Sequence, residues 1–376
     1  LSMLFNQSQS QLPIPEYQKG KAILSCTIAY FHPNENLIFK IGAPNIVMGT
    51  AETLYPTVES DGNFTINIPL YHHTQVRMMI GNADLVILLS PEKETNVAIN
   101  LSNPPGKQFV FSGQYATINN EWCQPELITK IPPVYSDGDL LDSIVGISAN
   151  EFKKRCINQY KRYVTHNNAQ LQFSEDTRTL ANLSCAFDCL EILQATHYCL
   201  QTAYQKKENI TREQAFAAFL DVYLPDDFHN YLKDFPVNHP LALYCYNYRN
   251  VVMDLYDTHK DPLAYEKNLL KNAPLTKEEQ TLIHQYETAF KAGISFQQES
   301  ELMALSAKYF KENDQFRWES FSKAKERLSN IIQDSTSLIV DYIRAFYMRS
   351  SFYYLQPLTP RQELMASENT SPIIIG

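Results

Sequence analysis

Glycine is scarce in this sequence, and none of the glycines forms a phosphate-binding motif. The 376 residues include 11 glycines, and neither a G-x-G-x-x-G nor a G-x-x-x-x-G-K-[ST] spacing occurs. Both motifs need glycine because backbone amides must approach the phosphate closely. Nucleotide binding by these two routes is therefore excluded.

Long apolar runs are also missing. No stretch of 18 or more apolar residues occurs, so the sequence predicts no transmembrane helix. Residues 1–20 lack a basic segment followed by an apolar one, and their Gln and Ser content is typical of a flexible tether. This start fits either a cytoplasmic N-terminus or an exported protein whose signal is absent. A lipid anchor would have to be attached through residues before Leu1.

Basic residues are too few to favour a polyanionic partner. The chain has 41 acidic and 32 basic residues, which gives a formal net charge of −9. This charge repels phosphate backbones and anionic lipid surfaces. We therefore expect no nucleic-acid partner.

No two cysteines have the C-x-x-C spacing of a redox pair or of many zinc sites. Cys185, Cys189, His197 and Cys199 are the candidate metal ligands, and Cys185 and Cys189 are spaced about one helical turn apart. One helix supplies only half of a tetrahedral site, whereas free cysteine commonly packs as a small buried residue. The sequence therefore predicts no metal and no cofactor, and it places these cysteines in the core.

The hydrophobic pattern changes near Gly113. Residues 21–113 contain short apolar runs separated by Pro, Asn, Gly and Asp, about the number and length of strands in an immunoglobulin-like antiparallel β-sandwich. Residues 114–376 show helical periodicity, beginning with a short helix in YATINNEWC. The predicted fold class is thus α+β and multidomain, with a β-sandwich domain followed by an all-α domain.

The segment ESDGNFTINIPL, residues 59–70, is the clearest strand signal. Asp61, Gly62 and Asn63 tolerate positive φ, and apolar residues then alternate with Thr, Asn and Pro. This pattern predicts the turn of a β-hairpin followed by a half-buried strand.

Several helix starts are marked by capping boxes, in which Thr is followed three residues later by Gln or Glu. These pairs are Thr211–Gln214, Thr276–Glu279 and Thr359–Gln362. The longest helical segment, from about Glu175 to Lys207, has apolar stripes on opposite sides. We expect this helix to pack against other parts of the protein on both of its apolar sides.

Asp226, Asp227 and His229 form the alternative candidate site, in the segment YLPDDFHNY. Carboxylates beside a histidine are the groups that general acid–base catalysis uses. Acidic residues between two helical stretches more often cap helices and contact solvent. No catalytic residue is therefore assigned, and these three remain the site of a second hypothesis.

Three segments in succession, VESDGNFTINIPL, DLVILLSPEKETNVAINL and FVFSGQYATINNEW, carry a resemblance to a known family. Their order and spacing are similar to the N-terminal region of exported bacterial thiol-disulfide oxidoreductases of the thioredoxin-like TlpA type. The likeness covers about residues 21–122 and, more weakly, the helices that follow. It implies a non-catalytic β-sandwich ahead of a helical region, in a protein of the periplasm or cell envelope.

The sequence departs from that family in two places. SPEKE stands where the family often has a glycine turn, and the family's C-x-x-C, at the start of a thioredoxin-fold helix, is absent. No catalytic residue can therefore be carried over. Because a helix starts at Thr359 and the apolar SPIIIG ends the chain, we expect a thioredoxin-like domain to follow Gly376.

Two functional hypotheses follow. In the first, the chain is an accessory region that positions a substrate, or a protein or peptide partner, for an exported thioredoxin-like oxidoreductase. In the second, it is an enzyme of unrecognised type with a site between the sandwich and the helices. Convergent polar groups with strongly shifted carboxylate or histidine pKa values would favour the enzyme, and a flat, apolar or tyrosine-rich groove would favour the accessory region.

Overall fold

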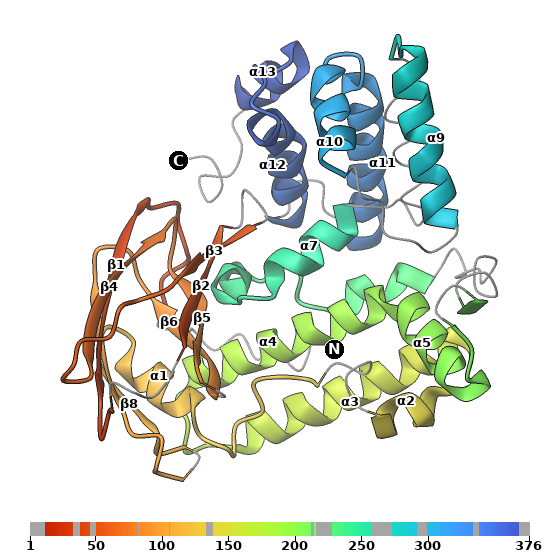
Figure 1. The fold of residues 1–376 in the computed structure, drawn as a ribbon. Helices are drawn as coiled ribbons and strands as arrows, with labels where there is room; N and C mark the ends of the chain where they lie inside the picture. The colour runs from red at the N-terminus through yellow and green to blue at the C-terminus, as the bar shows by residue number, and fades with distance from the viewer. Residues whose placement is uncertain are drawn as a thin grey trace.

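The computed structural model describes residues 12–32, 38–45, 50–81, 83–104, 106–132, 138–211, 214–215, 228–256, 273–291, 299–333 and 338–367. Two four-stranded sheets form the N-terminal part, and helices form the rest (Figure 1). The predicted two-part α+β layout is therefore confirmed.

The strands are β1 (Gly20–Ile28), β2 (Phe39–Asn45), β3 (Thr50–Leu54), β4 (Asn63–Leu70), β5 (Thr74–Ile80), β6 (Ala83–Leu89), β7 (Glu94–Ile99) and β8 (Phe109–Gly113). One sheet has the order β4-β1-β7-β8 and the other the order β3-β2-β5-β6. Strands β1 and β7 are parallel, while the other pairs are antiparallel.

This order leaves the immunoglobulin-like part of the prediction unconfirmed. In the immunoglobulin fold the first strand lies beside the second, in sheets of order ABED and CFG. Here β1 lies between β4 and β7, and β2 belongs to the other sheet. Strand number and length therefore predicted two packed sheets but not their connectivity.

The two sheets share one apolar core. Alternate residues of each strand face it, and Leu24, Ile41, Ile68, Val76 and Met78 are completely buried there. The period of two along a strand puts every second side chain on the same face. The core between the sheets therefore follows directly from the alternation in the sequence.

The predicted hairpin at residues 59–70 is wrong, although the predicted strand is present. β4 pairs with β1, where Phe64 lies opposite Cys26, while the preceding strand β3 belongs to the other sheet. Gly62 has φ of 84° and its carbonyl accepts a hydrogen bond from the Ile28 amide at 3.0 Å. A Cβ at this position would lie 2.8 Å from the Ile28 oxygen, so the turn requires glycine.

The helices follow the strands in chain order. They are α1 (Ala116–Trp122), α2 (Gly138–Ile144), α3 (Ala149–Ala169), α4 (Glu175–Gln194), α5 (Thr196–Glu208), the 3-10 helices η2 (Phe228–Asp234) and η3 (Pro240–Tyr244), α7 (Tyr248–Tyr256), α9 (Lys277–Lys291), α10 (Glu299–Lys308), α11 (Asp314–Ile332), α12 (Leu338–Tyr353) and α13 (Pro360–Ser367).

All three predicted capping boxes are confirmed. In each, the Thr hydroxyl accepts from the amide three residues later, and the Gln or Glu side chain accepts from the Thr amide. This reciprocal pair satisfies two amides that the start of a helix leaves unpaired.

The long helix predicted from Glu175 to Lys207 is divided at Ala195 into α4 and α5. The Thr196 hydroxyl donates to the Leu193 carbonyl at 2.6 Å, a local hydrogen bond that competes with the helical pattern. The expected burial is confirmed, because every residue of α4 from Leu180 to Leu193 except Glu191 is buried. In Figure 1, α4 runs between α3 and α7, which both contact it.

Helix α1 joins the two sheets to each other. The Asn119 side-chain amide accepts from the Leu88 amide at 2.7 Å and donates to the Leu88 carbonyl at 3.0 Å. Asn120 does the same with Phe111 in β8, at 2.8 and 2.9 Å. Since β6 and β8 are outer strands of different sheets, these two side chains supply the hydrogen bonds that a further strand would have made.

Replacing Asn119 with alanine tests this contact. Asn119 is 1% exposed, and Asn119→Ala leaves a buried N–H and a buried C=O of β6 without partners. We expect the free energy of unfolding to fall by on the order of 2–4 kcal/mol, measured by urea denaturation. The exposed Asn158 of α3 is the matched control, and Asn158→Ala is expected to change stability little. Equal effects of the two substitutions would contradict the proposed contribution of α1.

Candidate functional site

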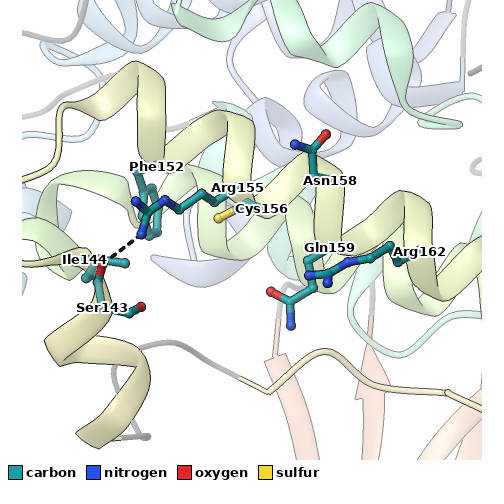
Figure 2. Close-up of a pocket in the computed structure, with 8 residues that line it drawn as sticks. All are labelled: Ser143, Ile144, Phe152, Arg155, Cys156, Asn158, Gln159 and Arg162. Atoms are coloured by element: carbon teal, nitrogen blue, oxygen red, sulfur yellow. Dashed lines mark hydrogen bonds between the residues drawn. The ribbon is translucent and has the colours of Figure 1, made fainter.

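Two cavities stand out in the part of the chain that the structure describes. The larger, of about 490 Å³, lies against α2 and α3 (Figure 2). Six of the residues drawn come from α3, and Arg155 donates to the Ser143 carbonyl at 2.8 Å and to Glu151 at 3.0 Å. Because one helix supplies six of the eight described lining residues, those residues do not bring together polar groups from distant parts of the fold.

The second cavity, of about 320 Å³, is the candidate site, and we call it the junction cleft. Its walls come from β5, β6, the start of β8 and the end of α1, and from the loop after α1, the middle of α4 and the residues just before α7. Its volume lies within the range of ligand sites, roughly 300–1,000 Å³. The cleft is therefore formed jointly by the sheets and the helices.

Hydrogen bonds fix the loop that follows α1. The Asn167 side-chain amide of α3 accepts from the Ile128 amide at 3.0 Å and donates to the Ile128 carbonyl at 2.8 Å. Three residues later, the Ile131 amide donates to Asp188 of α4 at 2.7 Å. Elsewhere in the lining, the Tyr246 amide donates to Gln75 of β5 at 3.1 Å. These contacts tie each wall to a neighbouring element.

Asp188 is the buried carboxylate of the junction cleft. Its side chain is 5% exposed, and it accepts hydrogen bonds from the Ile131 amide and the Asn247 side chain. Burial raises its pKa to about 6, against the opposing effect of these two hydrogen bonds and of Lys130. The group therefore titrates close to neutral pH.

The other charges of the cleft offset one another. Arg77 of β5 makes two hydrogen bonds with Asp84 of β6, at 2.7 and 2.6 Å. These hydrogen bonds lower the pKa of Asp84 and raise the pKa of Arg77. Lys130 acts electrostatically on both Asp84 and Asp188, so the opposite charges are balanced within the cleft.

A second raised carboxyl lies further along α4. Glu191 accepts from the Asn250 side chain at 2.6 Å, as Asp188 accepts from Asn247. Burial raises the pKa of Glu191 to about 7, and the nearby Asp188 adds to the shift. Two carboxyls of α4 are thus held by two asparagines at the same spacing beside α7.

The structure describes one of the three predicted site residues. Asp226 and Asp227 lie outside the described residues. His229 lies on η2, where its ring packs against Phe228 and Tyr231, and it does not line the junction cleft. The site at these three residues therefore stays a prediction.

Sequence reasoning missed Asp188, Lys130 and Asn247. The signal for Asp188 was available, since CAFDCL places a carboxylate within an apolar helical segment. Such a residue must either be paired or shift its pKa. Nothing local marks Lys130 or Asn247, because each reaches the cleft only through tertiary contacts.

The predicted placement of the cysteines in the core is confirmed. All seven are free, and all but the half-buried Cys123 are buried. Burial raises the thiol pKa of Cys156 and Cys199 to about 12 and that of Cys123 to about 11. Among the described residues, no three His, Cys, Asp or Glu side chains come together as metal ligands would.

Comparisons with known proteins add no relative. The scan against family models and the searches of curated proteins and of solved structures each find no match. Within the described ranges, no helix combines the length and apolar character needed to cross a membrane. The resemblance to the TlpA type therefore rests on the sequence segments alone.

The raised carboxyl pKa values predict that stability falls as pH rises. Glu191 binds its proton more tightly in the folded state, so its contribution is complete below the unfolded value of 4.5 and is lost as pH rises through about 7. Glu191→Gln keeps the oxygen that accepts from Asn250 and removes the charge. We expect this variant to be more stable than the wild type at pH 8, by on the order of 2 kcal/mol, and equally stable at pH 4.

Urea denaturation at a series of pH values measures this difference. The exposed Glu312 provides a matched control, because Glu312→Gln makes the same change of charge on the surface. A pH dependence in Glu191→Gln identical to that of the wild type would contradict the role assigned to the buried carboxyl.

Proposed function

We propose that this chain is a non-catalytic region that binds and positions a protein or peptide partner. Following the sequence resemblance, we further propose that it is the accessory region of an exported thioredoxin-like thiol-disulfide oxidoreductase of the periplasm or cell envelope. The junction cleft is the binding site in this proposal.

The observation that carries the proposal is the state of the thiol in the junction cleft. Cys123 is the one cysteine among the described residues that line it, and burial raises its pKa to about 11. At neutral pH the group is a thiol, whereas thiol-disulfide exchange requires a thiolate. Redox chemistry would therefore have to come from another domain.

The rigidity of the cleft also favours binding. Its walls are connected by hydrogen bonds that the side chains of Asn167, Asp188 and Gln75 accept from backbone amides, so little conformational freedom remains to be lost when a ligand enters. Opposite charges are already paired between Arg77 and Asp84. Such a site offers preorganised polar contacts to a ligand.

Tryptophan fluorescence can test binding at this site. The chain has two tryptophans, and Trp122 lines the junction cleft whereas Trp318 packs on Phe321 and Tyr347 in the helical part. In Trp318→Phe, Trp122 is the remaining reporter. We expect a saturable change in its emission when a permanently unfolded, tryptophan-free protein, reduced and carboxymethylated ribonuclease A, is added.

The reverse variant, Trp122→Phe, is the control, since it keeps Trp318 as a reporter away from the cleft. Its emission is expected to stay constant through the same titration. Absence of a saturable change in Trp318→Phe would argue against polypeptide binding in the junction cleft.

A second function is favoured by Asp188. A buried carboxyl with a pKa of about 6, at the wall of a cleft, is suited to general acid–base catalysis near neutral pH. This matches the hypothesis of an enzyme with a site between the sheets and the helices, with Asp188 in the catalytic role instead of the predicted Asp226, Asp227 and His229.

A panel of chromogenic esters, amides, glycosides and phosphomonoesters separates the two functions. If Asp188 is catalytic, the wild type will turn over a member of the panel with a pH profile that changes near 6, and Asp188→Asn will lower the rate at least about a hundredfold. Turnover that survives in Asp188→Asn would exclude this residue as the acid or base. Circular dichroism and thermal unfolding verify that the variant is folded.

A further inference from the structure

The outer edge of β6 is only partly covered. Among the described strands, β6 is the last of its sheet and pairs with β5 alone. At Leu88, both backbone polar groups point away from β5 and are bound by Asn119 of α1. The rest of this edge extends into the junction cleft, which Asp84, Leu85 and Val86 line.

The strand register shows which backbone groups face the cleft. In an antiparallel pair, every second residue directs both its N–H and its C=O away from the partner strand. Leu88 lies opposite Gln75, and Val86 lies opposite Arg77, two residues along. Val86 therefore presents its N–H and C=O on the same side as Leu88, and these groups have no partner among the described residues.

The start of β8 has the same arrangement and also lines the cleft. Phe111 directs its backbone groups outward to Asn120, and Phe109, two residues earlier in the same register, lines the cleft. Helix α1 thus covers one end of both outer strands. The other end of each strand faces the cavity.

Asn119 and Asn120 indicate what kind of ligand fits the end of β6 that α1 leaves uncovered. Each carboxamide presents a carbonyl and an N–H side by side, the same pair that a neighbouring peptide chain presents to an outer strand. At Val86, one strand repeat of about 6.8 Å beyond Leu88, no side chain of the described residues forms such a pair of hydrogen bonds. An extended peptide supplies N–H and C=O groups at that repeat.

The charged residues of the cleft also indicate what net charge a bound peptide should have. Arg77 and Asp84 are bound to each other, and Lys130 lies near both Asp84 and Asp188. Because these charges offset one another, a strongly charged ligand gains little and must still lose its hydration. The cleft is therefore better suited to an uncharged segment.

We propose that an extended, uncharged peptide segment of a partner protein adds as a further strand to β6, with its backbone hydrogen-bonded to Val86 in the junction cleft. This inference rests on the proposed binding function and specifies its mode. Main-chain hydrogen bonds of this kind provide affinity with little dependence on peptide sequence.

Proline at position 86 provides a direct test. Val86→Pro removes the outward N–H and breaks no hydrogen bond to β5, since Val86 and Arg77 form a non-hydrogen-bonded pair. Val86→Thr is the matched control, because it keeps both the N–H and a β-branched side chain. Peptides selected by the full wild-type chain from a phage library of linear peptides are titrated against both variants by fluorescence anisotropy.

We expect Val86→Pro to weaken binding about tenfold or more, which corresponds to at least about 1.4 kcal/mol, and Val86→Thr to remain within about threefold of the wild type. Should Val86→Pro fail to fold, N-methylation of alternate peptide amides replaces it, and methylation is expected to abolish binding at every second position only. Weaker binding by Val86→Pro, or loss of binding on methylation at alternate positions only, supports pairing of the peptide with the edge of β6.

Three outcomes would overturn the inference. Equal binding by wild type and Val86→Pro, or equal tolerance of N-methylation at all positions, would show that the peptide does not pair with β6. Failure to select any binding peptide would do the same, while the proposed function is judged separately by the Trp122 titration. A concentration-dependent dimer that Val86→Pro dissociates would show that the edge pairs with a second copy of the chain.

Discussion

Four consecutive residues of α1 hold the sheets and the helices in one arrangement. Asn119 and Asn120 satisfy the edges of β6 and β8, and Trp122 is buried in the helical core. Between them, Glu121 accepts from the Ser174 amide at 3.0 Å and from the Thr177 hydroxyl at 2.5 Å, at the start of α4. A carboxylate is favourable there because the first amides of a helix lack partners and carry partial positive charge.

The junction cleft is a consequence of this arrangement. Since α1 covers one end of β6 and β8 and also binds the start of α4, the space beyond its last turn is bounded by elements that are all hydrogen-bonded to α1. Asn167 and Asp188 then hold the loop after α1 against α3 and α4. Among the described residues, the outward N–H and C=O of Val86 lie beyond the reach of α1 and face the cleft without a protein partner.

Features set by local sequence were predicted, whereas those set by distant partners were not. The capping box at Thr359 depends on four residues, and its hydrogen bonds are those expected. The turn at Gly62 was recognised, but the strand that β4 pairs with lies far back in the chain. Asn119 and Asn120 stood within a recognised short helix, and nothing in their neighbourhood indicated that they would bind outer strands of two sheets.

The difference between local and distant determinants also explains why the residues of the candidate site were not predicted. Adjacent acidic residues and a histidine drew attention to Asp226, Asp227 and His229, whereas the shifted carboxyl of the cleft is a single aspartate on a buried helix. A buried carboxyl is costly, and it is tolerated at Asp188 because the Ile131 amide and the Asn247 side chain both need an acceptor there. Protonation of Asp188 would remove its negative charge and so weaken its interactions with these two donors and with Lys130. The geometry of the cleft wall and the ionisation of Asp188 therefore depend on each other. A ligand that excludes water from the cleft would favour the protonated form of Asp188. Ligand binding is thereby coupled to pH through Asp188, the residue that holds the loop after α1.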